Sequence, residues 1–212
     1  MWTVFFMRRV KIKYIEIAVL AALAITLLWG AWSLQNQDRL AEGLIRLHVI
    51  AHSDDPADQQ LKLQVRDAVL AEAGTLLEQM GNCADAVTRI REELPHLEEV
   101  ASKTIRESGY DYPVSAQLKQ TEFPLKEYDH FALPAGEYLA LRLVIGEGAG
   151  ENWWCVVYPP LCMTAATDME ETAVVCGMEQ EQVNLMQEEN TGYVLKFRSL
   201  ELWERLRQWL NK

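Results

Sequence analysis

The chain has 212 residues, of which 50% are apolar and 24% charged, and this composition indicates one folded domain of ordinary size with additional segments. Its net charge of −11 is unevenly distributed, because residues 1–33 hold four bases and one acid and the remainder holds 16 bases and 30 acids. Nucleic-acid binding requires clustered Lys and Arg, so such an acidic body excludes nucleic acid as a partner.

The first segment combines a basic start with an apolar run. Four bases lie in the first 13 residues, and the 18 residues 17–34 carry no charge. This order is typical of a secretory signal, whose bases stay on the cytoplasmic side. Eighteen helical residues span about 27 Å, close to the thickness of a bilayer core. We therefore assign residues 1–34 to a signal peptide, cleaved after Ser33, or to a retained signal anchor; both predict an exported protein.

A strand and two helices are expected next. Residues 35–43 are polar and predict a linker, and residues 44–51 alternate in the manner of a strand, with Arg46 and His48 on its more polar face. The Ser53–Pro56 turn then begins a helix that reaches about residue 80, since Pro suits the first helical position. A second helical pattern continues to about residue 109, and Pro95 is expected to kink or split it.

Three further strands are expected at residues 114–119, 138–145 and 153–158. The loop at residues 146–152 favours an antiparallel hairpin between the last two, because a parallel crossover needs a dozen or more residues. The sequence therefore predicts an α+β fold: a two-layer sandwich with a largely antiparallel sheet and helices on one face, preceded by the N-terminal transmembrane or signal helix. This domain is assigned to residues 44–163, and residues 164–212 to an acidic tail with a C-terminal amphipathic helix.

Four cysteines follow the N-terminal segment: Cys83, Cys155, Cys162 and Cys176. An even number in an exported chain permits disulfides, and four cysteines allow three pairings. Cys155 and Cys162 flank a Tyr-Pro-Pro turn, which makes them the candidate disulfide. The alternative is that the four are small buried apolar side chains.

The polar motifs do not assemble a recognisable active site. His48, Ser53 and Asp54 are types found in hydrolases, but the chain has no nucleophile elbow, phosphate-binding loop or dinucleotide fingerprint. His48 and His52 lie about 13 Å apart along a strand, and no Cys/His spacing fits zinc. We therefore predict no catalytic residue, no metal site, no cofactor and no small-molecule substrate: the protein is not expected to be an enzyme.

Two long strings carry a family resemblance: LIRLHVIAHSDDPADQQLKLQVRDAVL at residues 44–70 and GEGAGENWWCVVYPPLC at residues 146–162. The Arg46-x-His48 strand, the Ser53-Asp54-x-Pro turn and the Asn-Trp-Trp-Cys block closely resemble the stage II sporulation protein R family. The resemblance covers about residues 40–163. His52 is a departure, because the family pattern has asparagine there.

The resemblance implies a signal of endospore-forming bacteria rather than a catalyst. Members of this family are exported from the forespore into the space between forespore and mother cell. There they trigger a membrane-embedded aspartic protease, which processes the mother-cell sigma factor precursor. The expected partners are therefore that protease and, through the N-terminal segment, the membrane.

The contact surface for the protease is predicted at one of two places. The first is an exposed strand face and turn with Arg46, His48, Ser53 and Asp54; the second is the hairpin with Trp153 and Trp154. For Arg46 and His48 the alternative is a solvated or internally paired strand face. Of the two tryptophans, one must face the core because strand residues alternate.

Two other functions are considered beside the signalling one. An exported cell-wall hydrolase would use His48 with Asp54. A structural membrane-anchored domain would dock by the final helix, which carries Trp203 and Trp209 on one face. Neither explains the two long strings.

Overall fold

The computed structural model describes residues 16–29, 35, 38–77, 80–128, 131–161 and 169–187. The chain divides into two compact units, residues 1–39 and 40–212. In the first unit, residues 16–29 form a helix. A search of the described residues finds no helix with the length and apolar character needed to cross a bilayer. Residues 30–34, the end of the predicted export segment, lie outside the described part of the chain.

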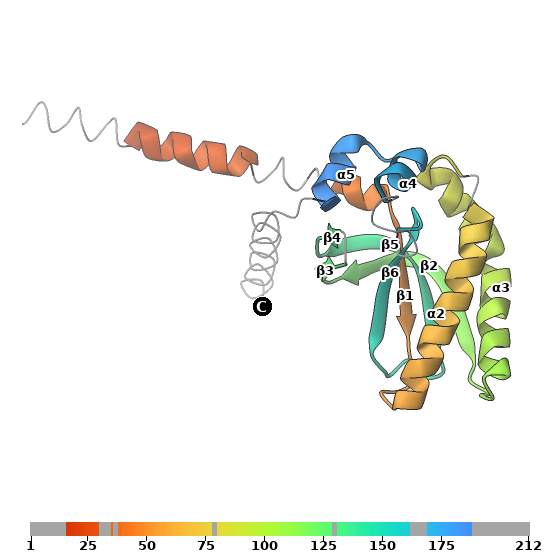
Figure 1. The fold of residues 1–212 in the computed structure, drawn as a ribbon. Helices are drawn as coiled ribbons and strands as arrows, with labels where there is room; N and C mark the ends of the chain where they lie inside the picture. Colours follow the sequence, from red (N-terminus) through yellow and green to blue (C-terminus); the bar gives the residue numbers. More distant parts are fainter. Residues whose placement is uncertain are drawn as a thin grey trace, which may run out of the picture. The chain divides into compact units, whose positions relative to one another are not determined.

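The second unit is built on a four-stranded sheet in the order β2-β5-β1-β6 (Figure 1). β1 (Ile45–Ile50) lies at the centre, parallel to β5 (Gly136–Ile145) and antiparallel to β6 (Asn152–Tyr158). β2 (Val114–Phe123) pairs antiparallel with β5. Two of the three pairings are antiparallel, so the prediction of an α+β fold with a largely antiparallel sheet is confirmed.

β5 and β6 do not form the predicted hairpin, because β1 lies between them. Their connecting loop crosses the end of β1 instead: the N–H groups of Ala149 and Gly150 donate to the carbonyl oxygens of His52 and Ala51. Neighbouring strands lie about 4.8 Å apart, so a loop of this length is able to step over one strand. Loop length alone therefore left the pairing undetermined.

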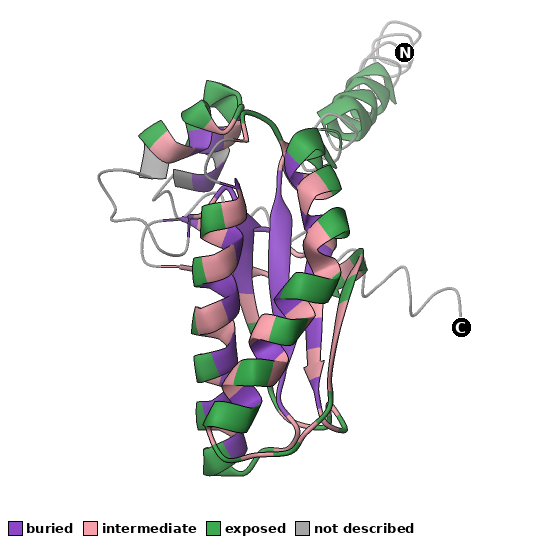
Figure 2. Cartoon of the chain, turned by 90° about the vertical axis from the view of Figure 1, so that its right-hand side faces the viewer, coloured by how far each residue is buried: buried purple, intermediate pink, exposed green. Residues whose placement is uncertain are grey.

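α2 (Pro56–Leu77) and α3 (Cys83–Glu107) cover one face of the sheet and turn their apolar sides toward it (Figure 2). Ile45, Leu47 and Val49 of β1 form the middle of this core, and all three are fully buried. The predicted start of the first helix at Pro56 is confirmed.

The second helix is not split at its proline. α3 contains Pro95 and continues without a break, and it begins after Asn82, whose side chain accepts from the N–H of Asp85. An interior proline costs a helix about 3 kcal/mol. Ile90 and Leu97, on either side of it, are fully buried, and each such side chain contributes about 1.5–3 kcal/mol. Packing on the sheet thus offsets the lost backbone hydrogen bond.

The opposite face of the sheet carries a second core at one end, which was not predicted. It brings together the small sheet of β3 (Lys126–Glu127) and β4 (Ala132–Leu133) with α4 (Met169–Val175) and α5 (Gln180–Gln187). Its buried side chains include Leu44, Phe123, Leu133, Tyr138, Val156, Ala173, Met178, Val183 and Met186. The prediction of helices on one face is therefore wrong at this end of the sheet.

Part of the predicted acidic tail belongs to this second core, since α4 and α5 contribute buried residues to it. The predicted C-terminal amphipathic helix, with Trp203 and Trp209, lies outside the described residues.

The crossing of the loop over β1 requires glycine at position 150. A Cβ there would overlap the carbonyl group of Ser53, which is backbone and has no rotamer to change. Gly150→Ala should therefore lower the free energy of unfolding by about 1–3 kcal/mol. In contrast, Gly74→Ala in α2 places its methyl in open space and should raise it by about 0.4–1 kcal/mol. Urea unfolding of both variants measures the difference, and unchanged stability for Gly150→Ala would contradict the crossing.

Candidate partner-binding site

Arg46 was predicted on an exposed strand face, and this is wrong: the residue is fully buried. Its guanidinium carbon lies 4.0 Å from the ring centroid of Phe123 and 4.8 Å from that of Tyr138. Its Nη2 donates to the hydroxyl of Tyr128 at 2.7 Å. The polar face of β1 is buried because these aromatic rings, distant in sequence, close over it.

The buried guanidinium forms no ion pair within the described part of the chain, and its Nη1 has no hydrogen-bond partner there. Loss of water lowers the pKa of Arg46, and its tyrosine neighbours offset part of that effect. The Tyr128 hydroxyl in turn donates to the carbonyl oxygen of Trp154 at 3.2 Å. Arg46 therefore has a structural role in the interior of the domain, where it fixes Tyr128 against β6.

His48 is also buried, with 5% of its surface exposed, so it does not form the predicted exposed surface. Its ring stacks on Trp154 with centroids 4.0 Å apart, and its Nε2 lies 2.7 Å from Oδ1 of Asn152. Burial lowers the pKa of His48; the bond to Asn152 opposes this shift, while Arg142 and Lys119 add to it. The imidazole is engaged internally rather than presented to a partner.

Ser53 and Asp54 hold the turn to neighbouring segments. The Ser53 hydroxyl donates to the carboxylate of Asp58 and accepts from the N–H of Asp55. One oxygen of Asp54 accepts from the N–H of Glu151 at 2.7 Å, which joins the turn to the crossing loop. Asp54 is exposed and Ser53 half-buried, so Asp54 is the one exposed residue of the predicted strand face and turn.

The two tryptophans face opposite ways, as alternation along a strand predicts. Trp154 turns toward His48. Trp153 is 37% exposed, and the guanidinium carbon of Arg66 lies 4.3 Å from its ring centroid. Of the two tryptophans, Trp153 is therefore the one that is exposed to another molecule.

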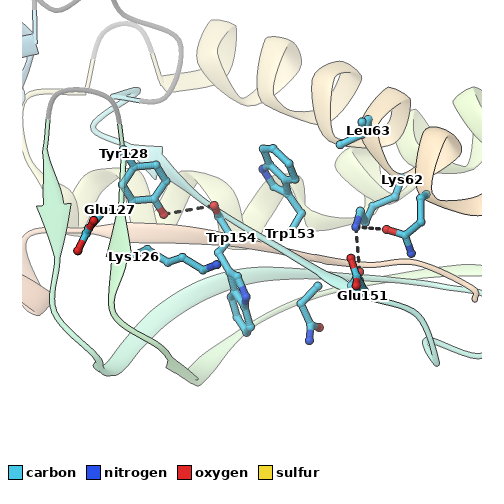
Figure 3. A pocket seen from close by; sticks show the side chains of 10 residues that line it. Lys62, Leu63, Lys126, Glu127, Tyr128, Glu151, Trp153 and Trp154 are labelled. Carbon is cyan, nitrogen blue, oxygen red and sulfur yellow. Dashed lines mark hydrogen bonds between the residues drawn. The ribbon is translucent and has the colours of Figure 1, made fainter. Parts of the chain in front are cut away.

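Both tryptophans line a pocket of about 460 Å³ beside β6 (Figure 3). α2, the β3 region and the start of β6 each supply walls, and the lining residues are Gln59, Lys62, Leu63, Lys126, Glu127, Tyr128, Glu151, Asn152, Trp153 and Trp154. The pocket thus gathers the tryptophan pair, one of the two predicted sites, with residues that were not predicted as contact residues.

Lys62 lies within the first of the two strings that carry the family resemblance, but it was not predicted as a site residue. It is only 4% exposed, and its Nζ donates to Oε1 of Gln59 at 2.5 Å and to the carbonyl oxygen of Glu151 at 3.0 Å. Burial lowers its pKa, although Glu151 and Asp54 offset part of the shift. A signal was present in the sequence, because Lys62 occupies the same helical stripe as the buried Val65 and Val69.

The cysteines differ from one another in state. Cys155 is disulfide-bonded, whereas Cys83 and Cys176 are free thiols. Cys162, its predicted partner, lies outside the described residues, so the pairing stays a prediction. Within the described ranges, no three His, Cys, Asp or Glu side chains are grouped to hold a metal ion.

The buried imidazole predicts a pH dependence of stability. Folding lowers the pKa of His48 from its ordinary value of 6.5. The contribution of His48 to the free energy of unfolding is therefore fully present above pH 6.5, and it is lost as the pH falls toward the pKa of the folded state. His48→Gln should therefore lose less stability between pH 7 and pH 5 than the wild type, as measured by urea midpoints. His96→Gln, at an exposed histidine, controls for the loss of an imidazole. Equal losses in His48→Gln and wild type would contradict the burial.

Comparison with known proteins agrees with the resemblance carried by the two strings. The family described as Stage II sporulation protein R matches residues 41–168, more than half of the chain. The stage II sporulation protein R of Bacillus subtilis (strain 168) is 41% identical over 118 residues, which cover 56% of this chain and about half, 53%, of the relative. No solved structure matches. The matched range contains every candidate contact residue, and the chain belongs to the stage II sporulation protein R family.

Proposed function

We propose that this protein is an exported intercompartmental signal of endospore formation, which triggers a membrane-embedded aspartic protease to process the mother-cell sigma factor precursor. The observation that carries the proposal is membership of the stage II sporulation protein R family over residues 41–168, which supports a role in sporulation. The protease partner and the act of triggering are the proposed part.

A signalling role is also favoured over a hydrolytic one by the state of the polar side chains. His48 bonds to Asn152 and stacks on Trp154, while Ser53 bonds to Asp58. A general base must lie within hydrogen-bond reach of its nucleophile. These groups are instead occupied with separate neighbours, which suits a structural role for each.

Activation by a binding protein requires a preference for one state of the protease. A ligand shifts a two-state equilibrium only by the difference of its affinities for the two states. Each tenfold gain in active protease needs a difference of about 1.4 kcal/mol. One well-packed aromatic contact made only in the active state is enough for such a gain, and Trp153 offers one.

Export is proposed from the N-terminal segment, where four bases precede the apolar residues 17–34. The domain would then reach the space between forespore and mother cell, either released by cleavage or held by the segment. A held domain would act only where the two membranes lie close together.

Co-expression in a non-sporulating host tests the proposal. The full-length chain is produced with the protease and its sigma factor precursor, and processing is followed by immunoblot. Processing should occur only when all three are present, and equal processing with and without this chain would contradict the proposed function. Deletion of residues 1–34 should abolish processing, and an unrelated signal peptide in their place should restore it, since the segment is expected to act by export alone.

A further inference from the structure

Two segments that are distant in the sequence, the start of α3 and the turn after α4, touch through their backbones (Figure 1). A Cβ at Gly177 would lie 2.6 Å from the carbonyl oxygen of Gly81 and 3.5 Å from the Cα atom of Asn82. Cys176 directly precedes Gly177, and Cys83 directly follows Asn82. The contact therefore brings together Cys83 and Cys176, which are both free thiols.

The hydroxyl of Tyr158 connects the same two segments. It shares its proton between the carbonyl oxygens of Met80 and Cys176, at 2.7 and 3.1 Å. Burial raises the pKa of this hydroxyl, and the side chains of Cys176 and Cys83 raise it further. Both thiols therefore lie close to one hydroxyl group, and both pack against the core between the sheet, α2 and α3.

Burial also disfavours the thiolate form of both cysteines. It raises the pKa of Cys83 to about 11, and it raises the pKa of Cys176, although the hydrogen bond from Tyr158 offsets part of this second shift. The thiolate is the form that attacks an oxidant or a disulfide. Oxidation of the pair is therefore expected to be slow and to depend on an oxidant supplied from outside the protein.

We propose that Cys83 and Cys176 form a disulfide after export, which fastens the turn after α4 to the start of α3. The proposal rests on the proposed function in its export, because disulfides form and persist outside the cytoplasm. Each thiol gives up one proton and one electron, and one S–S bond forms. The disulfide of an extracytoplasmic thiol–disulfide oxidoreductase accepts the two electrons and the two protons and becomes a dithiol.

The bond joins the two cores of the domain. α4 and α5 contribute buried residues to the second core, whereas α3 belongs to the first. A disulfide stabilises a protein mainly by restricting the unfolded chain, and a longer loop is restricted more. The loop from residue 83 to residue 176 includes β2, β5 and β6, so its closure constrains most of the sheet in the unfolded state.

Peptide mapping of the exported protein, produced from the full-length chain, tests the pairing. Free thiols are blocked with N-ethylmaleimide, and the unreduced protein is cleaved after glutamate, since Glu170 and Glu171 separate Cys176 from Cys162. Mass spectrometry should find the Cys83 peptide linked to the Cys176 peptide. The maleimide label on both of these cysteines, or a link from either one to a different cysteine, would overturn the proposal.

The variant Leu23→Arg is the control for export, because a charge within the apolar run should keep the full-length chain in the cytoplasm. Its Cys83 and Cys176 should both carry the label, and a link between them would overturn formation after export. Absence of the wild-type chain from the exported fraction would contradict the proposed function instead. Oxidation of the purified full-length protein with oxidised glutathione then tests the pairing by the same peptide map.

Thermal unfolding distinguishes a covalent link from the packing of two buried thiols. In the oxidised protein, Cys83→Ala should lower the unfolding midpoint by about 5–15 °C, and Cys176→Ala should lower it equally, because each substitution removes the same bond. The double variant should unfold at the same temperature as the single ones. Losses that add in the double variant, or that are as large in reducing buffer, would overturn the cross-link.

Discussion

The contact on which the second face of the sheet depends is a buried arginine surrounded by aromatic rings. Arg46 lies on the central strand and contacts Phe123 of β2, Tyr138 of β5 and the Tyr128 hydroxyl, while its Nε lies 3.5 Å from the carbonyl oxygen of Cys155 in β6. A guanidinium is planar and weakly hydrated, so it stacks on aromatic faces where an ammonium would keep its water. Through Tyr128 this one side chain also positions a wall of the pocket beside β6.

Local patterns in the sequence predicted which segments form helices and strands better than they predicted which of these segments lie side by side. The start of α2 at Pro56 follows from proline chemistry, and the buried face of β1 follows from alternation. The position of β1 between β5 and β6 did not follow, since a six- or seven-residue loop fits either a hairpin or a crossing. The burial of Arg46 did not follow either, because its partners lie 77 or more positions away in the chain and no local period signals them.

The candidate site shifted from one face of β1 to the edge of β6 for the same reason. Arg46 and His48 are polar, and in isolation a polar strand residue indicates solvent; here each is engaged by neighbours that only the tertiary fold supplies. Ser53, in the turn after the strand, is engaged locally by Asp58. Trp153 could be anticipated, because one of two adjacent tryptophans on a strand must turn outward. Lys62 could not be assigned from its helix alone, since its acceptor on Glu151 arrives from the crossing loop.

Amide hydrogen–deuterium exchange of the full-length protein, with and without the detergent-solubilised protease, tests most directly that the surface around Trp153 meets a partner. A bound partner slows exchange of the amides that it covers. Binding should slow exchange around Trp153 and in the neighbouring part of α2, residues 59–66, and leave β2 unchanged. Slowed exchange in residues 114–120 of β2, with α2 and the Trp153 region unaffected, would contradict it.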